Sequence, residues 1–384
     1  MSDLAVSFVE SISEIGGDDW NALAGTDNPF TRYEFLWTLE STGCTTRASG
    51  WQPYHIIVRR VKPGLDDIVA LLPLYLKSNS WGEYVFDWAW SNAYRQHGLD
   101  YYPKFVTAAP FTPSYGRRLL LANGEEPGPV LELLQTAIAE KADFLSASSW
   151  HVLFPDAEQQ RWFTAAGMLP RIACQFHWFN RDYKSFDDFL AALSSRKRKN
   201  LKKERARVAE SGIQFRKLEG ADIDAARWQD FYSFYQSTYL MRGMQGYLNQ
   251  DFFMELSRAM PEQLLMICAE QDERMIAAAL FFKSGDTLFG RYWGAAADFD
   301  FLHFETCYYQ GQDYAIEHGY KRFDPGAQGE HKIQRGFEPI LTHSNHWIAQ
   351  PPFRDAIAHF LQEEKQHILE YQQEAQNLLP YRKE

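Results

Sequence analysis

Apolar positions along the chain follow two different periods, and together they predict a fold that mixes helices with strands. Spacings of three and four residues predict helices over 31–43, 129–143, 156–167, 185–212, 222–240, 304–319 and 353–379. Alternating or continuous apolar runs predict strands over 53–61, 68–77, 82–90, 150–154, 213–220, 264–270, 275–295 (a pair joined by a Gly-Asp turn) and 320–326. The proline-rich stretch 103–116 predicts an irregular surface loop or cleft wall.

The order of these elements is similar in the two halves of the chain. In each half, strands lead to a helix and a further short strand, which is an α+β pattern and suggests a duplication. A length of 384 residues also fits two domains better than one core. We therefore expect an α+β fold divided into residues 1–181 and 182–384.

Charge and cysteine content narrow the class of protein. A formal net charge of −11 disfavours broad, nonspecific nucleic-acid binding, which depends on neutralising many phosphates. The first residues show no basic region before an apolar stretch, and no apolar run approaches the roughly 18 residues of a membrane span, so neither a secretory signal nor a span is expected. Four scattered cysteines indicate reduced thiols and a cytoplasmic protein.

One segment departs from this acidic background. Residues 194–209 read SSRKRKNLKKERARVA, and eight of the twelve residues from Arg196 to Arg207 are Lys or Arg. Like charges four residues apart, such as Lys199 and Lys203, destabilise a helix by a few tenths of a kcal/mol per pair. The apolar residues on one stripe of this helix, by which it should dock, are Leu190, Leu193, Leu201 and Val208.

Three interpretations of this basic helix stay open. In the first, the helix presents a solvated face whose charge is balanced by acids from elsewhere in the chain. In the second, it is a site for ligand phosphates, and in the third, it is an RNA-binding surface. A metal site is not expected near the C-terminal end, because His343 and His346 lack a third ligand at a recognisable spacing apart from His331.

Five longer stretches carry a resemblance to a known family. They are DNPFTRYEFLWTLE, GWQPYHIIV, LPLYLKSNSWGEYVFDWAW, YYPKFVTAAPFTPSYGRRLL and RYWG…HFETCYYQ…GAQGEHKIQRGFEP. Through them the chain, from about residue 28 to its end, resembles the FemAB-like family of predicted N-acyltransferases. That family is associated with peptidoglycan biosynthesis or recognition and is similar to tandem GNAT-fold proteins.

The resemblance implies two GNAT-like halves with mixed central sheets flanked by helices, the second including the basic helix 194–209. It implies transfer of an acyl or aminoacyl group to an amine of an anionic, peptidoglycan-precursor-like acceptor. The alternative is a non-catalytic protein of the same fold that recognises a cell-wall precursor or peptide. No tightly bound cofactor is expected, since acyl-CoA or aminoacyl-tRNA would be a donor substrate. The second half lacks the two long polar helices that tRNA-using Fem transferases often carry, so tRNA is the less favoured partner.

The stretch DPGAQGEHKIQRGFEP is the part of the chain richest in chemical groups. Gly326 and Gly329 allow close backbone approach. The resemblance assigns the phosphates of the acceptor to Lys332, with Arg335 beside it and Arg198 contributed by the basic helix. The acceptor is then expected between the halves, near Lys332 and the loop PFTPSYG. The alternative is a loop held rigid by salt bridges.

Acyl transfer needs a deprotonated amine, a stabilised oxyanion and a protonated leaving group. By the resemblance His331 and Glu305 lie at one cleft, and both are residue types that act as a base. Tyr308, three residues after Glu305 on the same helix face, would orient Glu305 or supply a proton. Each of these side chains also has a structural interpretation.

A coenzyme A site is the remaining candidate. GNAT acetyltransferases hold a pyrophosphate on a [Q/R]-x-x-G-x-[G/A] turn, where free backbone amides and the helix dipole favour anions. Arg291, Gly294 and Ala296 match these letters. Asp298 and Asp300 follow and would repel a pyrophosphate. The alternative is the end of a strand, where small residues pack under the next helix.

Overall fold

The computed structural model describes residues 4–62, 65–241, 243–297, 299–327 and 329–382, which form two compact units. The first unit comprises Met1–Ala173 and Leu341–Leu369, and the second comprises Cys174–Ile340 and Glu370–Glu384. Each unit is therefore assembled from two stretches of chain. Compactness does not test whether the chain consists of two related halves that meet at residue 181, so that division stays a prediction.

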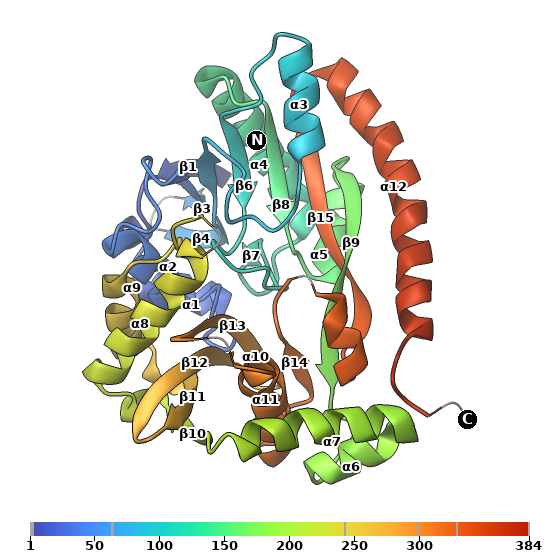
Figure 1. The fold of residues 1–384 in the computed structure, drawn as a ribbon. Coiled ribbons are helices and arrows are strands. Elements are labelled where there is room, and N and C mark those ends of the chain that lie inside the picture. Colours follow the sequence, from blue (N-terminus) through green and yellow to red (C-terminus); the bar gives the residue numbers. More distant parts are fainter. Residues whose placement is uncertain (1–3, 63–64, 242, 298, 328, 383–384) are drawn as a thin grey trace. The chain divides into compact units, whose positions relative to one another are not determined.

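The first unit contains two sheets (Figure 1). The order β1-β3-β4-β7 is antiparallel throughout, whereas the order β15-β8-β6-β5-β2 includes one parallel pair, β6 with β8. The strands are β1 (Leu4–Val9), β2 (Trp51–Pro53), β3 (His55–Lys62), β4 (Leu65–Leu72), β5 (Tyr75–Lys77), β6 (Lys104–Thr107), β7 (Leu120–Leu121), β8 (Ser149–Leu153) and the end of β15 (Glu338–Ile348). The helices are α1 (Gly17–Ala24), α2 (Tyr33–Ser41), α3 (Trp88–Gln96), α4 (Pro127–Leu145), α5 (Ala157–Ala165) and most of α12 (Pro351–Asn377).

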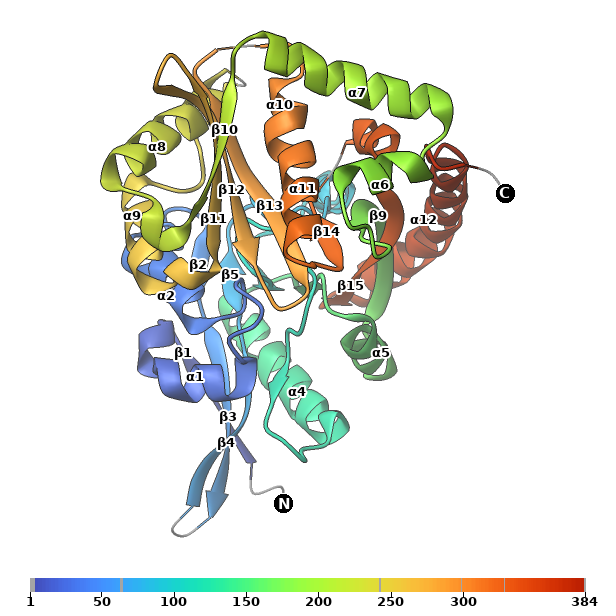
Figure 2. The same ribbon diagram turned by 90° about the horizontal axis from the view of Figure 1, so that it is seen from below.

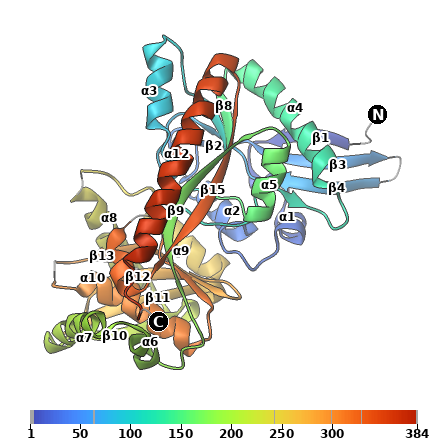
Figure 3. The same ribbon diagram turned by 90° about the vertical axis from the view of Figure 1, so that its right-hand side faces the viewer.

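Helix α4 shows how the sequence pattern builds the core of the first unit. A proline stands at its first position, where no backbone donor is needed, and Ser146 ends it in the left-handed conformation. The apolar face of α4 packs on the sheets and lies beside β1 (Figure 3). That face consists of Val130, Leu131, Leu134, Ile138 and Ala142.

The second unit has one mixed sheet of order β10-β11-β12-β13-β14-β9, in which β13 and β14 run parallel. Its strands are β9 (Leu169–Phe179, from Cys174 onward), β10 (Gln214–Glu219), β11 (Leu264–Gln271), β12 (Arg274–Lys283), β13 (Thr287–Ala295) and β14 (Arg322–Asp324). Its helices are α6 (Phe186–Ala192), α7 (Ser195–Glu210), α8 (Ala225–Leu240), α9 (Gln250–Ala259), α10 (Leu302–Phe304) and α11 (Gln310–Glu317), with a π-helical turn at Glu305–Tyr309 and a 3-10 helix at Glu330–Arg335. The basic helix α7 runs across the end of the α10–α11 helix (Figure 2).

Several expectations about local structure are wrong. The helix predicted over 185–212 is two helices, α6 and α7, because Leu193 leaves the helical conformation with a ψ of 154°. Residues 82–90 form no strand, and helix α3 begins at Trp88 instead. The alternating pattern there was misleading, because Phe86 and Trp88 are exposed while Trp90 and Tyr94, four residues apart, are buried as on a helix. Within the stretch 103–116, predicted to be an irregular surface loop or cleft wall, Lys104–Thr107 form the buried strand β6 between β5 and β8. The residues after it are irregular, as predicted, but 108–114 are buried rather than on the surface.

The α+β class with mixed sheets flanked by helices is confirmed. Among the residues that the structure describes, no helix combines the length and the apolar content needed to cross a bilayer.

Candidate functional site

Strands β13 and β14 run side by side for a short distance and then separate. Thr287–Phe289 pairs in parallel register with Arg322–Asp324. Strand β14 ends at Asp324, whereas β13 continues to Ala295 and stays paired with β12. Beyond Asp324, β13 and β14 are therefore no longer paired, and residues from the interior of the second unit can lie between them.

Arg291 is a bulge residue at this point. Gly290 and Tyr292 pair with consecutive residues of β12, so Arg291 is the extra residue between them. Bulges bend a strand and redirect a side chain. The Arg291 guanidinium reaches Asp324, with Nη2 2.7 Å from Oδ2 and Nη1 3.1 Å from Oδ1.

The Arg291–Asp324 pair is buried, and each of the two side chains is at most 2% exposed. Burial opposes ionisation of Asp324, but Arg291 beside it holds the pKa of the carboxyl well below its usual range. His177 lies 3.5 Å from Asp324 Oδ1. Burial lowers the pKa of His177 to about 4, so this imidazole is neutral near pH 7. Arg291, which was predicted to bind coenzyme A, therefore uses its guanidinium in an internal ion pair.

The two small residues of the predicted coenzyme A turn also make internal contacts. Gly294 lies within β13, and a Cβ at this position would overlap the backbone of Phe234 in α8. The absence of a side chain thus lets α8 pack directly on the strand. The amide of Ala296 donates to Ile276 O at 2.7 Å.

A cavity of about 90 Å³ lies where β13 and β14 separate. Its walls come from β12, from β13, from the helix that follows β13 and from the loop after β14. The side chains and backbone that line it belong to Ala279, Leu280, Phe281, Gly290, Arg291, Tyr292, Trp293, His303, Cys307, Tyr308 and Pro325. The cavity thus brings the predicted residues Arg291 and Tyr308 to one place.

The helix that supplies Tyr308 contains a π-helical turn. Residues 302–317 form α10, the turn Glu305–Tyr309 and α11 in direct succession. One extra residue in a helical turn shifts the faces on which later side chains lie, and such turns are frequent at functional sites. Here the turn directs Tyr308 and Cys307 toward the cavity, while Glu305 is held by α7.

Tyr308 and His331 form a hydrogen-bonded pair, with the Tyr308 hydroxyl 2.9 Å from His331 Nε2. Burial raises the pKa of Tyr308 well above its ordinary value, so the phenol keeps its proton. Partial burial of the ring, together with Lys332 and Arg335, lowers the pKa of His331 to about 4, although the residue as a whole stays exposed. Gly329 precedes this pair with a φ of 104°, and a Cβ there would lie 2.6 Å from the His331 ring.

Lys332 is buried and holds the loop before it. Its ammonium donates to the carbonyl oxygens of Gly326 at 2.9 Å and Ala327 at 3.2 Å. Burial lowers the pKa of Lys332 to about 7, against the opposing effect of Asp324. Gly326, with a φ of 83°, donates its amide to Asp324 Oδ1 at 2.9 Å. The predicted phosphate ligand thus serves as an internal brace for the loop that lines the cavity.

Glu305 pairs with the basic helix. Arg205 Nη2 lies 2.9 Å from Glu305 Oε1 and 2.7 Å from Asp313 Oδ2. Gln310 donates to the same Oε1 at 2.8 Å. Burial raises the pKa of Glu305, and Arg205 opposes that rise. The contacts place Glu305 under α7 rather than beside His331.

Arg335 also lies under the basic helix. It donates to Glu204 Oε2 at 2.8 Å and to the His331 carbonyl at 2.8 Å, and its guanidinium lies 3.4 Å from the centre of the Phe304 ring. Tyr309 donates its hydroxyl to the same carboxylate. Arg335 therefore ties α7, the π-helical turn and the 3-10 helix together.

The outer side of α7 carries the remaining cations. Arg196, Lys199 and Lys203 are exposed, and within the described parts of the chain their side chains show no hydrogen bond or ion pair. The Arg198 side chain is half-buried and likewise has no such contact there. Of the three interpretations of this helix, the first describes its inner face, where acids from elsewhere in the chain neutralise the cations.

The structure therefore brings together Tyr308, His331, Lys332 and Gly326 around one loop and cavity, and sets Glu305, Arg335 and Arg198 under or along α7. The sequence analysis did not identify Asp324, which bonds Arg291 and the Gly326 amide, or Arg205, which bonds Glu305. Asp324 could have been noticed, because it lies in the predicted strand 320–326, directly before Pro325 and Gly326. No signal in the sequence distinguishes Arg205 from its basic neighbours.

Comparisons with known proteins agree with this architecture. Crystal structures with the same fold include FemX (11% identity, TM-score 0.52, covering 92% of this chain and 100% of FemX). A second is the C-terminal domain of a putative lysylphosphatidylglycerol synthetase from Agrobacterium fabrum (11% identity, TM-score 0.51, covering 90% and 93%). A tandem GNAT protein from the clavulanic acid biosynthesis pathway matches at 10% identity and a TM-score of 0.48, covering 91% and 99%. A search of curated protein sequences gives no match.

The sequence model of one family, described as peptidoglycan biosynthesis/recognition, matches residues 11–383. That match spans both units, and the expected family is confirmed with it. The chain belongs to the FemAB-like family.

Proposed function

We propose that this protein transfers an acyl or aminoacyl group to an amine of an anionic acceptor, such as a peptidoglycan precursor. The observation that carries the proposal is the Tyr308–His331 pair, which stands at a cavity where two parallel strands separate. The description of the family and the transferases among proteins of similar fold support the class of reaction.

The cavity of about 90 Å³ is small compared with the roughly 300–1,000 Å³ of a complete ligand site. On this proposal it receives the acyl end of the donor, and the rest of the donor lies outside it. Beyond Phe289, β13 pairs with β12 alone among the described strands, so its other edge faces this space. The nature of the donor, acyl-CoA or aminoacyl-tRNA, and a cytoplasmic location stay predictions.

The proposed reaction forms a bond from the amine nitrogen to the acyl carbon and breaks the bond from that carbon to the leaving oxygen or sulfur. The proton lost by the amine ends on the leaving atom. A neutral His331 and a protonated Tyr308 form a relay for that proton: Tyr308 donates to the leaving atom and is reprotonated through the imidazole, which takes the amine proton. Lys332 acts by bracing the loop at the cavity rather than by meeting the substrate.

A binding protein without transferase activity is the second candidate, and a specific observation favours it. Arg291, Lys332 and Glu305 all make internal contacts, so the ionic side chains most suited to chemistry already stabilise the fold. A cleft built in this way could recognise a precursor and leave it unchanged.

The test measures product and binding together. Purified protein is incubated with a nucleotide-linked peptidoglycan precursor and either acetyl-CoA or aminoacyl-tRNA, and products are identified by mass spectrometry while precursor binding is followed by calorimetry. Tyr308→Phe and His331→Gln should each lower turnover by roughly 10²-fold or more. The matched controls Tyr320→Phe and His318→Gln, in the same unit, should leave it unchanged.

The outcomes separate the candidates. Precursor binding without product for either donor favours the binding protein. Product formation that survives Tyr308→Phe and His331→Gln removes the proposed roles of these residues. Neither binding nor product contradicts both candidates for this acceptor.

A further inference from the structure

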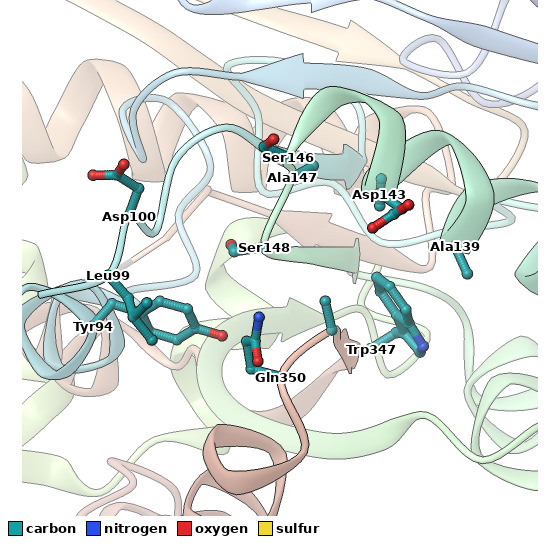
Figure 4. Close-up of a pocket in the computed structure, with 12 residues that line it drawn as sticks. Tyr94, Leu99, Asp100, Ala139, Asp143, Ser146, Ala147, Ser148, Trp347 and Gln350 are labelled. Carbon is teal, nitrogen blue, oxygen red and sulfur yellow. The ribbon is translucent and has the colours of Figure 1, made fainter. Parts of the chain in front are cut away.

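The first unit contains a pocket of its own, of about 420 Å³, which shares no lining residue with the cavity at Tyr308. It lies where α4 ends and β8 begins, beside the C-terminal end of α3 and the residues that follow β15 (Figure 4). Its volume falls within the range of sites for small molecules.

The walls of this pocket are fixed by backbone hydrogen bonds. Ser146 ends α4 with a φ of 54°, and the Ala147 amide donates to Ala142 O at 2.8 Å. Ser148 then donates its amide to Pro103 O at 2.9 Å and accepts from the Ala349 amide at 2.9 Å. The serine turn and the segment after β15 are thus held together without a ligand.

One polar group inside the pocket lacks a partner. Tyr94 is 1% exposed, and its hydroxyl makes no hydrogen bond within the described residues. Its ring is held by Phe353, 4.0 Å away between centroids, and the hydroxyl is directed across the pocket toward Gln350 (Figure 4). A buried hydroxyl without a partner is unfavourable, and a ligand that forms a hydrogen bond with it would remove that cost.

The charge on the lining has a single sign. Asp100 and Asp143 both line the pocket, are exposed and make no ion pair in the described parts of the chain, and no Lys, Arg or His lines it. The two carboxylates lie on opposite sides of the pocket, with Asp143 on the side of Trp347 (Figure 4). A carboxylate at a concave site attracts a cation, and an ammonium group donates strong hydrogen bonds to it.

The remaining lining suits a ring that carries hydroxyl groups. Trp347 contributes a half-buried indole, and Ser148 and Gln350 contribute polar groups on the same walls (Figure 4). An indole packs against the apolar face of a ring and also favours a nearby cation. We propose that this pocket binds an amino sugar, with its ammonium at Asp143, its ring against Trp347 and a hydroxyl at Tyr94.

The test uses three probes that separate these features. Glucosamine carries both ring and ammonium, glucose carries the ring without the charge, and ethanolamine carries the charge without the ring. Each is titrated into the full chain by calorimetry, with saturation-transfer NMR to identify the bound face. We expect saturable binding of glucosamine and affinities at least about tenfold weaker for the other two, which corresponds to about 1.4 kcal/mol.

Variants locate the site. Asp143→Asn should weaken glucosamine binding about tenfold, whereas Glu140→Gln, an equal charge change on the same helix but outside the pocket, should not. Tyr94→Phe removes only the hydroxyl without a partner, so it should weaken binding while leaving the unfolding temperature unchanged or higher. Absence of saturable glucosamine binding, equal affinity for glucose or ethanolamine, or equal effects of Asp143→Asn and Glu140→Gln would overturn the proposal. The proposed transferase activity is measured separately and does not depend on this result.

Discussion

Arg205 of the basic helix reaches down to Glu305 of the π-helical turn, 100 positions further along the chain, and bonds it at 2.9 Å. The Glu305 side chain is 4% exposed, so Arg205 neutralises a carboxylate that has little access to water. The same guanidinium also contacts Asp313. A helix with an unfavourable local charge pattern is thereby held in place by acids from a distant segment.

Arg205→Ala should therefore destabilise the protein strongly. It leaves Glu305 buried without its cation, and breaking one side of such a pair costs about 3 kcal/mol. The control Arg207→Ala removes an exposed cation of the same helix and should change the free energy of unfolding by less than about 0.5 kcal/mol. Urea denaturation of both variants checks this. Equal, small effects would show that the pair contributes nothing to stability.

The sequence was sufficient to predict a basic helix here, although the single helix predicted over 185–212 is two helices, and only Leu201 and Val208 of the predicted docking stripe lie on α7. Leu190, Leu193, Leu201 and Val208 all lie in the interior, as predicted, but Leu190 belongs to α6 and Leu193 to the break between the two helices. The partners of the charges on α7 could not be predicted, because Glu305 and Asp313 are brought there by the order of strands rather than by local spacing. The same limit applies to the candidate site, where Tyr308 and His331 come together through the fold.

Gly294→Ala tests whether this glycine serves packing. A Cβ would overlap the backbone of Phe234, and backbone cannot yield as a flexible side chain does, so α8 must move away from β13. We expect a loss of about 1–3 kcal/mol in the free energy of unfolding, with no coenzyme A present. Gly128→Ala in α4, where a Cβ meets nothing within 4 Å, is the control and should be neutral or stabilising. A stable Gly294→Ala variant would contradict the packing role.

His177 predicts an acid-sensitive contribution to stability. Burial lowers its pKa to about 4, below the roughly 6.5 of an unfolded chain. Between these values the unfolded state binds more protons, so the contribution is complete above about pH 6.5 and is lost as the pH falls toward 4. Relative to wild type, His177→Gln should show a shallower fall of the unfolding free energy over that range. His318→Gln, an exposed histidine of the same unit, is the control. Parallel pH profiles for wild type and His177→Gln would show that His177 does not titrate in this way.

The outer side of α7 predicts a stabilising substitution. Lys199 and Lys203 are exposed and four residues apart, so their charges repel. Lys199→Glu replaces that repulsion by an attractive pair in the favourable order, with the acid toward the N-terminal end, and should add roughly 0.5 kcal/mol to the free energy of unfolding. The gain should shrink as salt screens the charges. Lys202→Glu makes the same charge change but loses the contact with Asp187 at 3.2 Å, so it should gain less. If Lys199→Glu instead lowers the stability at low salt, the outer cations are balanced by acids of the fold, and the exposed face does not carry the uncompensated charge described above.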